Sequence, residues 1–382
     1  MKQKLSFFIA TPFLWLFSHT ALADWALNMP VGVTESSREI YRLHMLIFWV
    51  CVVIAVVVFA AMIYSIIAFR RSKHPTPATF THSTKAEIVW TLIPVVILVA
   101  MALPAADTML RIEDSRNADL TVKVTGYQWK WHYDYIDDGF GFFSNLDADS
   151  NKVRQLDSKL DPNAVPDYLR NVDKPMIVPV NTKVRLLLTS ADVLHAWWVP
   201  ELGGKMDAIP GFVRDMWFKA DTIGTYRGQC AELCGRDHGF MPVVVDVVSQ
   251  DDYDLWVANN TAQSQQAQAQ AAADADKVWT KDELMSKGES VYGTFCSACH
   301  QANGKGLPPT FPGLLGSPSL SGPMDDHIDV ILNGRSGTAM AAFGGQLTDA
   351  EIAAVVTYER NAWGQDTGDI TQPKDVAAKR DE

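Results

Sequence analysis

The chain contains Cys230-Ala-Glu-Leu-Cys234-Gly-Arg-Asp-His238-Gly-Phe-Met241, a stretch that offers two thiols, an imidazole and a thioether in twelve residues. A further imidazole stands upstream at His195, in Asp192-Val-Leu-His195-Ala-Trp-Trp. Thiolate and imidazole with a weak methionine ligand form the set that electron-transfer copper sites use, because a fixed cage of mixed softness changes little between oxidation states. The stretch therefore predicts a copper site on a loop.

Two other chemistries account for part of this stretch. A disulfide between Cys230 and Cys234 is expected of cysteines in an oxidising compartment, but it gives no role to His238 or Met241. A structural zinc ion takes two cysteines and two histidines, but it has no use for Met241, and the C-x2-C spacing typical of zinc ribbons is missing. Copper accounts for more of the donors than either alternative.

A second pair of cysteines lies in Cys296-Ser-Ala-Cys299-His300, the C-x-x-C-H motif of covalent haem attachment. In this motif both thiols add to haem vinyl groups, and the histidine becomes an axial ligand of the iron. A thioredoxin-like interpretation needs a βαβ context that the surrounding sequence lacks, and a plain disulfide leaves His300 without a role. The motif therefore predicts a c-type haem.

An electron-carrying haem needs a sixth iron ligand, and methionine raises the reduction potential relative to a second histidine. Met340, which follows His300 by forty residues in Gly337-Thr-Ala-Met340-Ala-Ala-Phe-Gly, is one candidate. Met324 and His327 are the alternatives. If they are not ligands, we expect both to be surface residues at the start of a helix.

The first hundred residues carry the signals of export and of membrane insertion. Two lysines, an apolar run and Ala21-Leu22-Ala23 form the three-part pattern of a secretory signal over residues 1–23. The alternative, a first membrane span, needs a longer apolar run. Residues 43–69 and 88–106 are each long and apolar enough to cross a bilayer, which predicts a transmembrane hairpin within residues 24–107.

The loop between the two spans is rich in basic residues, which places it on the cytoplasmic side of a bacterial inner membrane. The rest of the chain is then periplasmic or otherwise outside. The basic residues are Arg70, Arg71, Lys73 and Lys85.

The outer part changes texture twice. Residues 120–257 alternate β-branched and polar side chains between Pro and Gly, which predicts an antiparallel β-sandwich or barrel over residues 108–259. Residues 260–278 contain a run of only Gln and Ala, which predicts a linker, helical or not, that lets the last domain dock and retreat. Capping boxes at Thr280…Glu283 and Thr348…Glu351 predict a small α-domain over residues 279–364. Residues 365–382 are polar and expected to be a disordered tail.

Charge limits the classes of partner. The net charge of −11 argues against nucleic acid and suits a surface that meets a basic protein. Acidic residues concentrate in residues 134–173, a pattern typical of solvated loops and also a candidate docking surface. Glu87 lies at the start of the second span, where a carboxylate is either functional or simply favoured by the helix dipole.

These features together resemble subunit II of the cytochrome c oxidases, members of the haem-copper oxidase family, from the first span to about residue 257. The resemblance implies a cupredoxin-like β-domain and a binuclear copper (CuA) site. The implied copper ligands are His195, Cys230, Cys234, His238, Met241 and the backbone carbonyl of Glu232.

The same resemblance implies further roles. The carboxylate of Glu232 would bind a magnesium ion shared with the catalytic subunit. Electrons would enter at Trp129, in Gly126-Tyr127-Gln128-Trp129-Lys-Trp131, and Glu87 would lie at the mouth of a proton-uptake path. Trp131 is expected to be one of several half-buried strand aromatics. Phe212 departs from many relatives, which have Arg there.

The C-terminal part resembles the class I cytochromes c over about residues 284–363. This resemblance implies haem ligation by His300 and Met340, although the proline that usually follows the methionine is replaced here by Ala341. A copper subunit fused to such a domain resembles the caa-type oxidases.

The predicted function is that of the membrane-anchored, electron-accepting subunit of a respiratory oxidase. Its partners would be catalytic subunit I, further membrane subunits, and a donor such as cytochrome c. The rivals are the copper-containing subunit of a nitric oxide or nitrous oxide reductase and an electron-transfer anchor without an oxidase. A nitrous oxide reductase needs a further multi-histidine copper cluster, and only nine histidines are present. A quinol oxidase subunit has no reason to keep Cys230 and Cys234.

Overall fold

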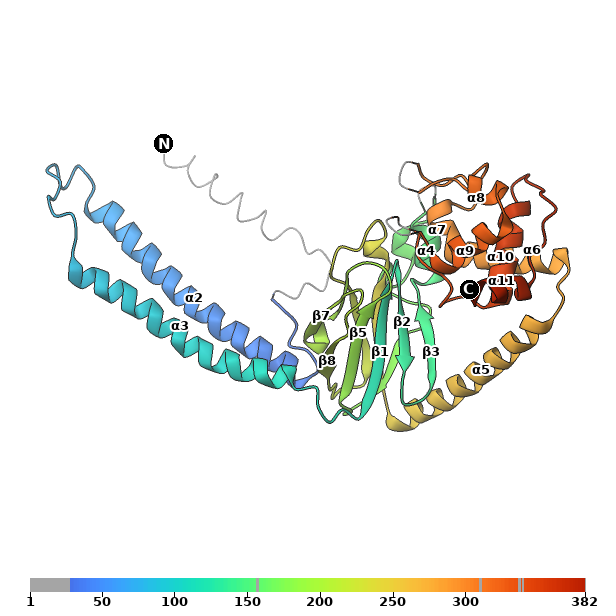
Figure 1. Cartoon of the computed structure of the whole chain (residues 1–382). Coiled ribbons are helices and arrows are strands. Elements are labelled where there is room, and N and C mark those ends of the chain that lie inside the picture. The colour runs from blue at the N-terminus through green and yellow to red at the C-terminus, as the bar shows by residue number, and fades with distance from the viewer. Residues whose placement is uncertain (1–27, 156–157, 309–310, 336–337, 339, 382) are drawn as a thin grey trace. The chain divides into compact units, whose positions relative to one another are not determined.

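Two compact parts make up the chain in a computed structural model that describes residues 28–155, 158–308, 311–335, 338 and 340–381 (Figure 1). One part comprises residues up to 133 and residues 143–250, and the other comprises residues 134–142 and 251–382. The predicted signal sequence, residues 1–23, lies outside the described residues.

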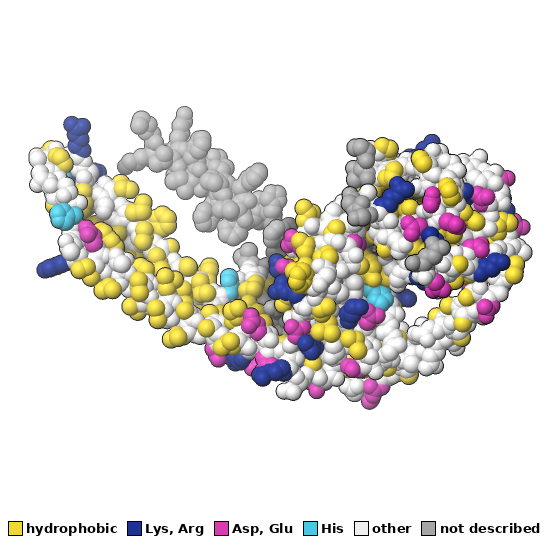
Figure 2. Space-filling model, in the orientation of Figure 1, with side chains coloured by type: hydrophobic (Ala, Val, Ile, Leu, Met, Phe, Trp, Pro, Cys, Tyr) yellow, Lys and Arg dark blue, Asp and Glu magenta, His cyan; other side chains and the backbone are white. Residues whose placement is uncertain are grey.

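The two predicted spans correspond to two long helices, α2 (Glu35–Ala68) and α3 (Thr84–Glu113), although the first helix ends one residue before its predicted span does. Both are long and apolar enough to cross a membrane, and hydrophobic side chains line much of their length (Figure 2). Each helix also begins before its predicted span, and α3 ends after its own, because the polar ends continue the helical hydrogen bonding. At the start of α2, Thr34 and Ser37 form a capping box, and near the end of α3 Arg111 pairs with Glu39 at 2.9 Å.

The outer domain consists of two five-stranded sheets, in the orders β3-β2-β1-β5-β8 and β4-β10-β9-β6-β7. Buried residues alternate along the inner strands, and the core contains Trp131, Tyr133, Trp197 and Phe218. The strands are β1 (Leu120–Tyr127), β2 (Lys130–Tyr135), β3 (Phe140–Ser144), β4 (Met176–Pro179), β5 (Val184–Ser190), β6 (His195–Val199), β7 (Gly204–Ala208), β8 (Arg214–Phe218), β9 (Gly224–Cys230) and β10 (Pro242–Val248). Short helical turns interrupt the connections: α4 (Ala148–Val153), η1 (Pro162–Ala164), η2 (Pro200–Leu202) and η3 (His238–Phe240).

The sheets are mixed rather than wholly antiparallel, which corrects the predicted strand pairing. β1 runs parallel to β5, and β10 runs parallel to β4. Parallel neighbours need a long crossover, and the chain between β1 and β5 is long enough to supply it. The β-region also ends at Val248 rather than near residue 257. Tyr253 and Trp256 favour strands by type, but they belong to a helix.

The C-terminal part is helical. Its helices are α5 (Gln250–Asp276), α6 (Lys281–Val291), a π-turn (Tyr292–Cys296), α7 (Ser297–His300), α8 (Pro318–Ser321), α9 (Met324–Asn333), α10 (Asp349–Asn361) and α11 (Pro373–Arg380). Both predicted capping boxes are present, at the starts of α6 and α10. A Cβ on Gly288 would lie 2.2 Å from the carbonyl oxygen of Ala354, so α6 and α10 cross closely only because this residue is glycine.

The predicted linker is helical, because it forms the second half of one continuous helix, α5. Its sequence contains neither Gly nor Pro and is rich in Ala and Gln, which are good helix formers. Near its start, the Trp256 ring packs 4.9 Å from that of Tyr135, and the Tyr253 hydroxyl donates to Asp138 at 3.0 Å. A helical spacer of this kind is semi-rigid.

The expected disordered tail is wrong as well, because residues 373–380 form α11. Val376 is fully buried in the core that α6, α9 and α10 share. The side chain of Gln372 makes two hydrogen bonds with the backbone of Trp279, at 2.9 and 3.0 Å. Only one apolar side chain per turn is buried, so the polar composition of the tail conceals its packing.

Val376→Ala is expected to lower the free energy of unfolding of the C-terminal part by about 1–3 kcal/mol, through lost apolar burial and the cavity left behind. The measurement is urea unfolding of the full-length chain in detergent. Lys374→Ala on the exposed face of α11 is the matched control and should leave the midpoint unchanged. Equal midpoints for the Val376→Ala variant and the original chain would contradict a packed tail.

Candidate functional site

Strand pairing brings the predicted sulfur and nitrogen donors together at one end of the three inner strands of the second sheet. β6 begins at His195 and β9 ends at Cys230. β9 runs antiparallel to β6 and to β10, with Trp197 opposite Cys230, so its end meets the starts of both neighbours. Met241 directly precedes β10, and the turn η3 begins at His238. The fold therefore gathers residues from three chain segments.

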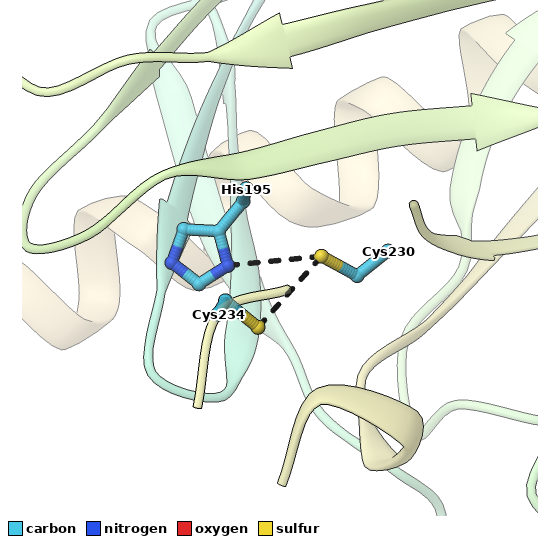
Figure 3. Close-up of side chains that lie close together, drawn as sticks. All are labelled: His195, Cys230 and Cys234. Atoms are coloured by element: carbon cyan, nitrogen blue, oxygen red, sulfur yellow. Dashed lines mark hydrogen bonds between the residues drawn. The ribbon is translucent and has the colours of Figure 1, made fainter. Parts of the chain in front are cut away.

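Each predicted donor lies within contact distance of a cysteine sulfur. The two Sγ atoms are 3.8 Å apart. Cys230 Sγ lies 3.9 Å from His195 Nδ1 and 3.3 Å from the carbonyl oxygen of Glu232. Cys234 Sγ lies 3.5 Å from His238 Nδ1 and 3.5 Å from Met241 Sδ. Figure 3 shows His195, Cys230 and Cys234 pointing toward one another, and their ligand atoms all lie within 4.8 Å.

Four of the donor side chains are shielded from water, and His238 is half-buried. His195 is fully buried, and Cys230, Cys234 and Met241 are each exposed by 3% or less. The hydrogen bond between the two cysteines, together with the contacts of Cys230 with His195 and the backbone, lowers the pKa of Cys230 far below that of an ordinary thiol. The same hydrogen bond and burial raise the pKa of Cys234. A thiolate is the form that binds metal, so a metal that uses both sulfurs must displace the proton that the pair retains.

Asp192 fixes the ring of His195 from behind. Its Oδ1 lies 2.9 Å from His195 Nε2, which leaves Nδ1 directed at Cys230. Burial by itself would lower the pKa of His195, but the hydrogen bonds with Asp192 and Cys230 outweigh it and raise the pKa. Carboxylates in this position set the tautomer and orientation of metal-bound histidines.

A second layer of contacts comes from the turn between β1 and β2. Trp129 Nε1 and Gln128 Nε2 both donate to the carbonyl oxygen of Cys234, at 3.1 and 2.9 Å. The backbone N–H of Gln128 donates to Asp192 at 2.7 Å. The indole of Trp131 is fully buried, not half-buried as expected, and its ring centroid lies 5.8 Å from that of His195.

The loop that carries His238 is braced by a buried ion pair. Asp237 is 3% exposed, and its carboxylate lies 3.2 Å from Arg154 Nη1 and 3.1 Å from Arg236 Nε. The guanidinium of Arg154 also stacks 4.4 Å from the ring centroid of Phe240. These contacts hold the residues on both sides of His238 in the η3 turn.

In the C-terminal part, His300 ends α7, and its Nδ1 lies 3.0 Å from the carbonyl oxygen of Pro312. An Nδ1–H that donates to a carbonyl orients the ring and leaves Nε2 as the ligand atom. Cys296 and Met340 are half-buried and pack against the same apolar core. Other half-buried apolar side chains on this core, suited to contact an apolar macrocycle, are Phe295, Leu314, Phe343 and Trp363.

The alternative sixth ligands are engaged elsewhere. His327 is 2% exposed, and its Nε2 lies 2.8 Å from the carboxylate of Glu359, so the expectation of a surface position is wrong for this residue. The helix start predicted there turns its buried face toward α10. Met324 is half-buried, and its sulfur accepts a hydrogen bond from Thr371 at 2.9 Å.

Three other predicted residues lie apart from these contacts. Glu87 sits half-buried in the first turn of α3, where its backbone N–H donates to Ser83 at 3.0 Å. The side chain of Glu232 is partly exposed between the two cysteines, and Phe212 is 66% exposed.

Comparison with known proteins decides the family. A family described as cytochrome C oxidase subunit II, periplasmic domain, matches residues 120–248, and its transmembrane domain matches residues 23–107. A family described as cytochrome C oxidase, cbb3-type, subunit III matches residues 283–358. A probable cytochrome c oxidase subunit 2 of Rickettsia bellii is 38% identical over 252 residues, which cover 64% of this chain and 90% of that protein. The chain belongs to the cytochrome c oxidase subunit II family.

The chain is also similar to two further proteins of known name. The cytochrome c oxidase subunit 2 of Cereibacter sphaeroides is 37% identical over 56% of this chain and 75% of its own length. The crystal structure of the periplasmic domain of subunit II from Bradyrhizobium japonicum is 41% identical, covers 39% of this chain and 99% of its own, and has a TM-score of 0.34. The subunit II part is joined to a C-terminal cytochrome c domain, as in a caa-type fusion.

The donor set fits the copper that subunit II of an oxidase contains. Two thiolates, two imidazoles, a thioether and a carbonyl converge, which is the soft, mixed set that copper favours. A disulfide requires sulfurs about 2.0 Å apart and would leave four donors idle. Tetrahedral zinc would leave the thioether and the carbonyl idle.

Sequence reasoning missed the residues that support the donors. It quoted Asp192, Gln128 and Gly126 without giving them a role, and it passed over Asp237 and Arg154. The usable signal was the carboxylate three residues before His195, since metal-bound histidines usually contact such a group. The ion pair of Asp237 with Arg154 depends on a long-range contact that no local pattern reveals.

Gly126→Ala is expected to reduce copper binding about tenfold or more while the β-domain stays folded. A Cβ at this position would lie 2.8 Å from His195 Cδ2 and would push the imidazole out of place. Copper content per chain, measured by atomic absorption, tests this. Gly239→Ala is the matched control, because a Cβ there, beside His238, meets nothing within 4 Å. Similar copper loss in both variants would contradict the steric argument.

Asp192→Asn is expected to weaken copper binding by roughly 10- to 100-fold, the usual cost of changing the outer partner of a metal-bound histidine. Competition with a copper chelator measures the change. Asp207→Asn removes a half-exposed carboxylate at 3.8 Å from Arg214 and serves as control. Unchanged affinity in Asp192→Asn would show that His195 needs no carboxylate to hold its ring.

Proposed function

We propose that this chain is the electron-accepting subunit of a respiratory cytochrome c oxidase. It takes single electrons from an outside donor at its C-terminal domain and delivers them through the β-domain to a separate catalytic subunit that reduces oxygen. The observation that carries the proposal is the convergence of six donors on two cysteine sulfurs 3.8 Å apart. No simpler use of these residues needs all six.

The residues of the β-domain are suited to hold two copper ions with little movement. The proposed ligands are His195, Cys230, Cys234, His238, Met241 and the carbonyl of Glu232. When bound, the metals supply reversible one-electron transfer. Burial of most donors and the hydrogen bonds that Asp192 accepts and that Gln128 and Trp129 donate fix the ligand atoms before any electron arrives. A cage that does not rearrange keeps the barrier to electron transfer low.

Cys296, Cys299 and His300 are proposed to hold a covalent haem c, with Met340 as the sixth ligand. The contact between His300 and Pro312 orients the imidazole. Exposed carboxylates in residues 134–173, among them Asp149 and Asp161, supply negative charge for docking a basic donor such as cytochrome c.

Three finer roles rest on the family resemblance and on position. Trp129 donates directly to the carbonyl of Cys234, which supports it as the point where electrons reach the copper ligands. The partly exposed Glu232 carboxylate is proposed to bind magnesium at the boundary with catalytic subunit I. Glu87 is proposed to lie at the mouth of a proton-uptake path, on the cytoplasmic side of a bacterial inner membrane.

Cys230→Ser separates the two proposed electron carriers. Oxygen consumption by the purified oxidase complex is expected to fall by at least roughly 10- to 100-fold. Losing a copper ligand should cost no less than losing a residue that only orients one. Haem absorbance and its reduction by the donor should persist, since Cys296 and Cys299 are untouched. Cys51→Ser, which changes an exposed cysteine in α2, is the matched control. Normal oxygen consumption by Cys230→Ser would refute the proposed path.

A further inference from the structure

The C-terminal tail holds the chain segment that follows Met340. Arg380, the last residue of α11, reaches back to this segment and to the start of α10. Its guanidinium donates to the carbonyl oxygens of Gly344 and Leu347, and its Nε lies 2.9 Å from the carboxylate of Asp349. One planar group therefore joins three points within six residues.

The opposite side of the same segment is bonded to the end of α9. The N–H groups of Phe343 and Gly344 donate to the carbonyls of Ile331 and Leu332, at 2.9 and 3.0 Å. The N–H of Arg335 donates to the carbonyl of Met340 at 2.9 Å. The segment from Met340 to Leu347 thus lies between α9 and Arg380. A Cβ on Gly344 would lie 2.9 Å from the Leu332 carbonyl and 3.4 Å from Arg380 Nη1, which shows how closely the two sides approach.

The tail also engages the alternative sulfur donor. Thr371, which precedes α11, is fully buried, and its hydroxyl donates to the sulfur of Met324 at 2.9 Å. The N–H of Thr371 donates to the Thr357 hydroxyl at 3.0 Å, which fixes this part of the tail on α10. One tail segment therefore contacts both the methionine that is not the proposed ligand and the segment that carries the one that is.

We propose that Arg380 is a positioning residue for the sixth haem ligand. It keeps residues 340–347 closed against α9, so that the Met340 thioether remains at the iron. The inference rests on the proposed function, because it requires a haem held by Cys296, Cys299 and His300. Residues 373–380 lie beyond the part of the chain that matches the cytochrome family, residues 283–358, so the matched domain is held by an element outside it.

The Met340 thioether would compete with other ligands for the iron. A thioether is a weak ligand carried here on an irregular segment, and each opening of that segment lets another ligand bind. The fork of Arg380 lowers the population of the open segment through hydrogen bonds from a charged donor. Lysine keeps the charge but offers a point donor that does not bridge three acceptors in a fixed plane.

The test measures the affinity of imidazole for the ferric haem of the full-length chain in detergent, from the shift in haem absorption. Arg380→Ala is expected to raise this affinity about tenfold, the factor that corresponds to losing hydrogen bonds from a charged donor. It should also weaken the sulfur-to-iron charge-transfer absorption. Arg380→Lys should show most of the change, and it decides the matter if Arg380→Ala does not fold. Lys374→Ala removes an exposed positive charge from the same helix and should match the original chain.

If both Arg380 variants bind imidazole with the affinity of the original chain while Met340→Ala binds it strongly, the positioning role of Arg380 (the Arg380 clamp) is overturned. The proposed haem ligation would then still stand. Original affinity in Met340→Ala would overturn Met340 as the ligand, and with it the clamp. A change in Lys374→Ala as large as that in Arg380→Ala would also overturn the clamp, because charge alone would then explain the effect.

Discussion

Antiparallel pairing of β9 with both β6 and β10 is the constraint on which the site depends. It brings the end of one strand to the starts of two others. Cys230, His195 and Met241 therefore meet although they are separated in the sequence. Cys234 and His238 then need only a short loop to reach the same point. The sheets fix the donors, and the partly buried contacts of Asp192, Gln128 and Trp129 hold the loop in place. Such preorganisation is what rapid one-electron transfer requires, because little has to move when the charge changes.

In the C-terminal part, contacts from neighbouring elements also hold the proposed ligands in place. Cys296, Cys299 and His300 are close in sequence, so a local helix is enough to place them, whereas Met340 is carried on an irregular segment that needs outside support. Backbone bonds from α9 on one side and Arg380 on the other supply that support. The tail therefore belongs to the domain that it follows, and α5 connects this domain to the β-region as a continuous helix rather than as a loose chain.

Much of this arrangement could be predicted from the sequence, because the chemistry is written in local patterns. The apolar runs predicted α2 and α3, the two capping boxes predicted the starts of α6 and α10, and the spacing from Cys230 to Met241 predicted which donors meet. Other features depend on contacts between distant residues. The parallel pairing of β1 with β5, the burial of Val376 in a polar tail and the partnership of His327 with Glu359 leave no periodic trace. The composition of the linker left open whether it is helical. It forms a helix because a run of Gln and Ala without Gly or Pro favours one.

We propose that the donors around Cys230 hold a pair of coppers that exchange single electrons with a covalent haem on the same chain. The most direct measurement is the ratio of copper to haem iron in the purified full-length chain, combined with electron paramagnetic resonance of its oxidised form. The account predicts two coppers for each haem and a signal from one unpaired electron shared by both coppers. A correctly folded, haem-bearing chain that binds no copper, or a single copper with an unshared signal, would contradict it.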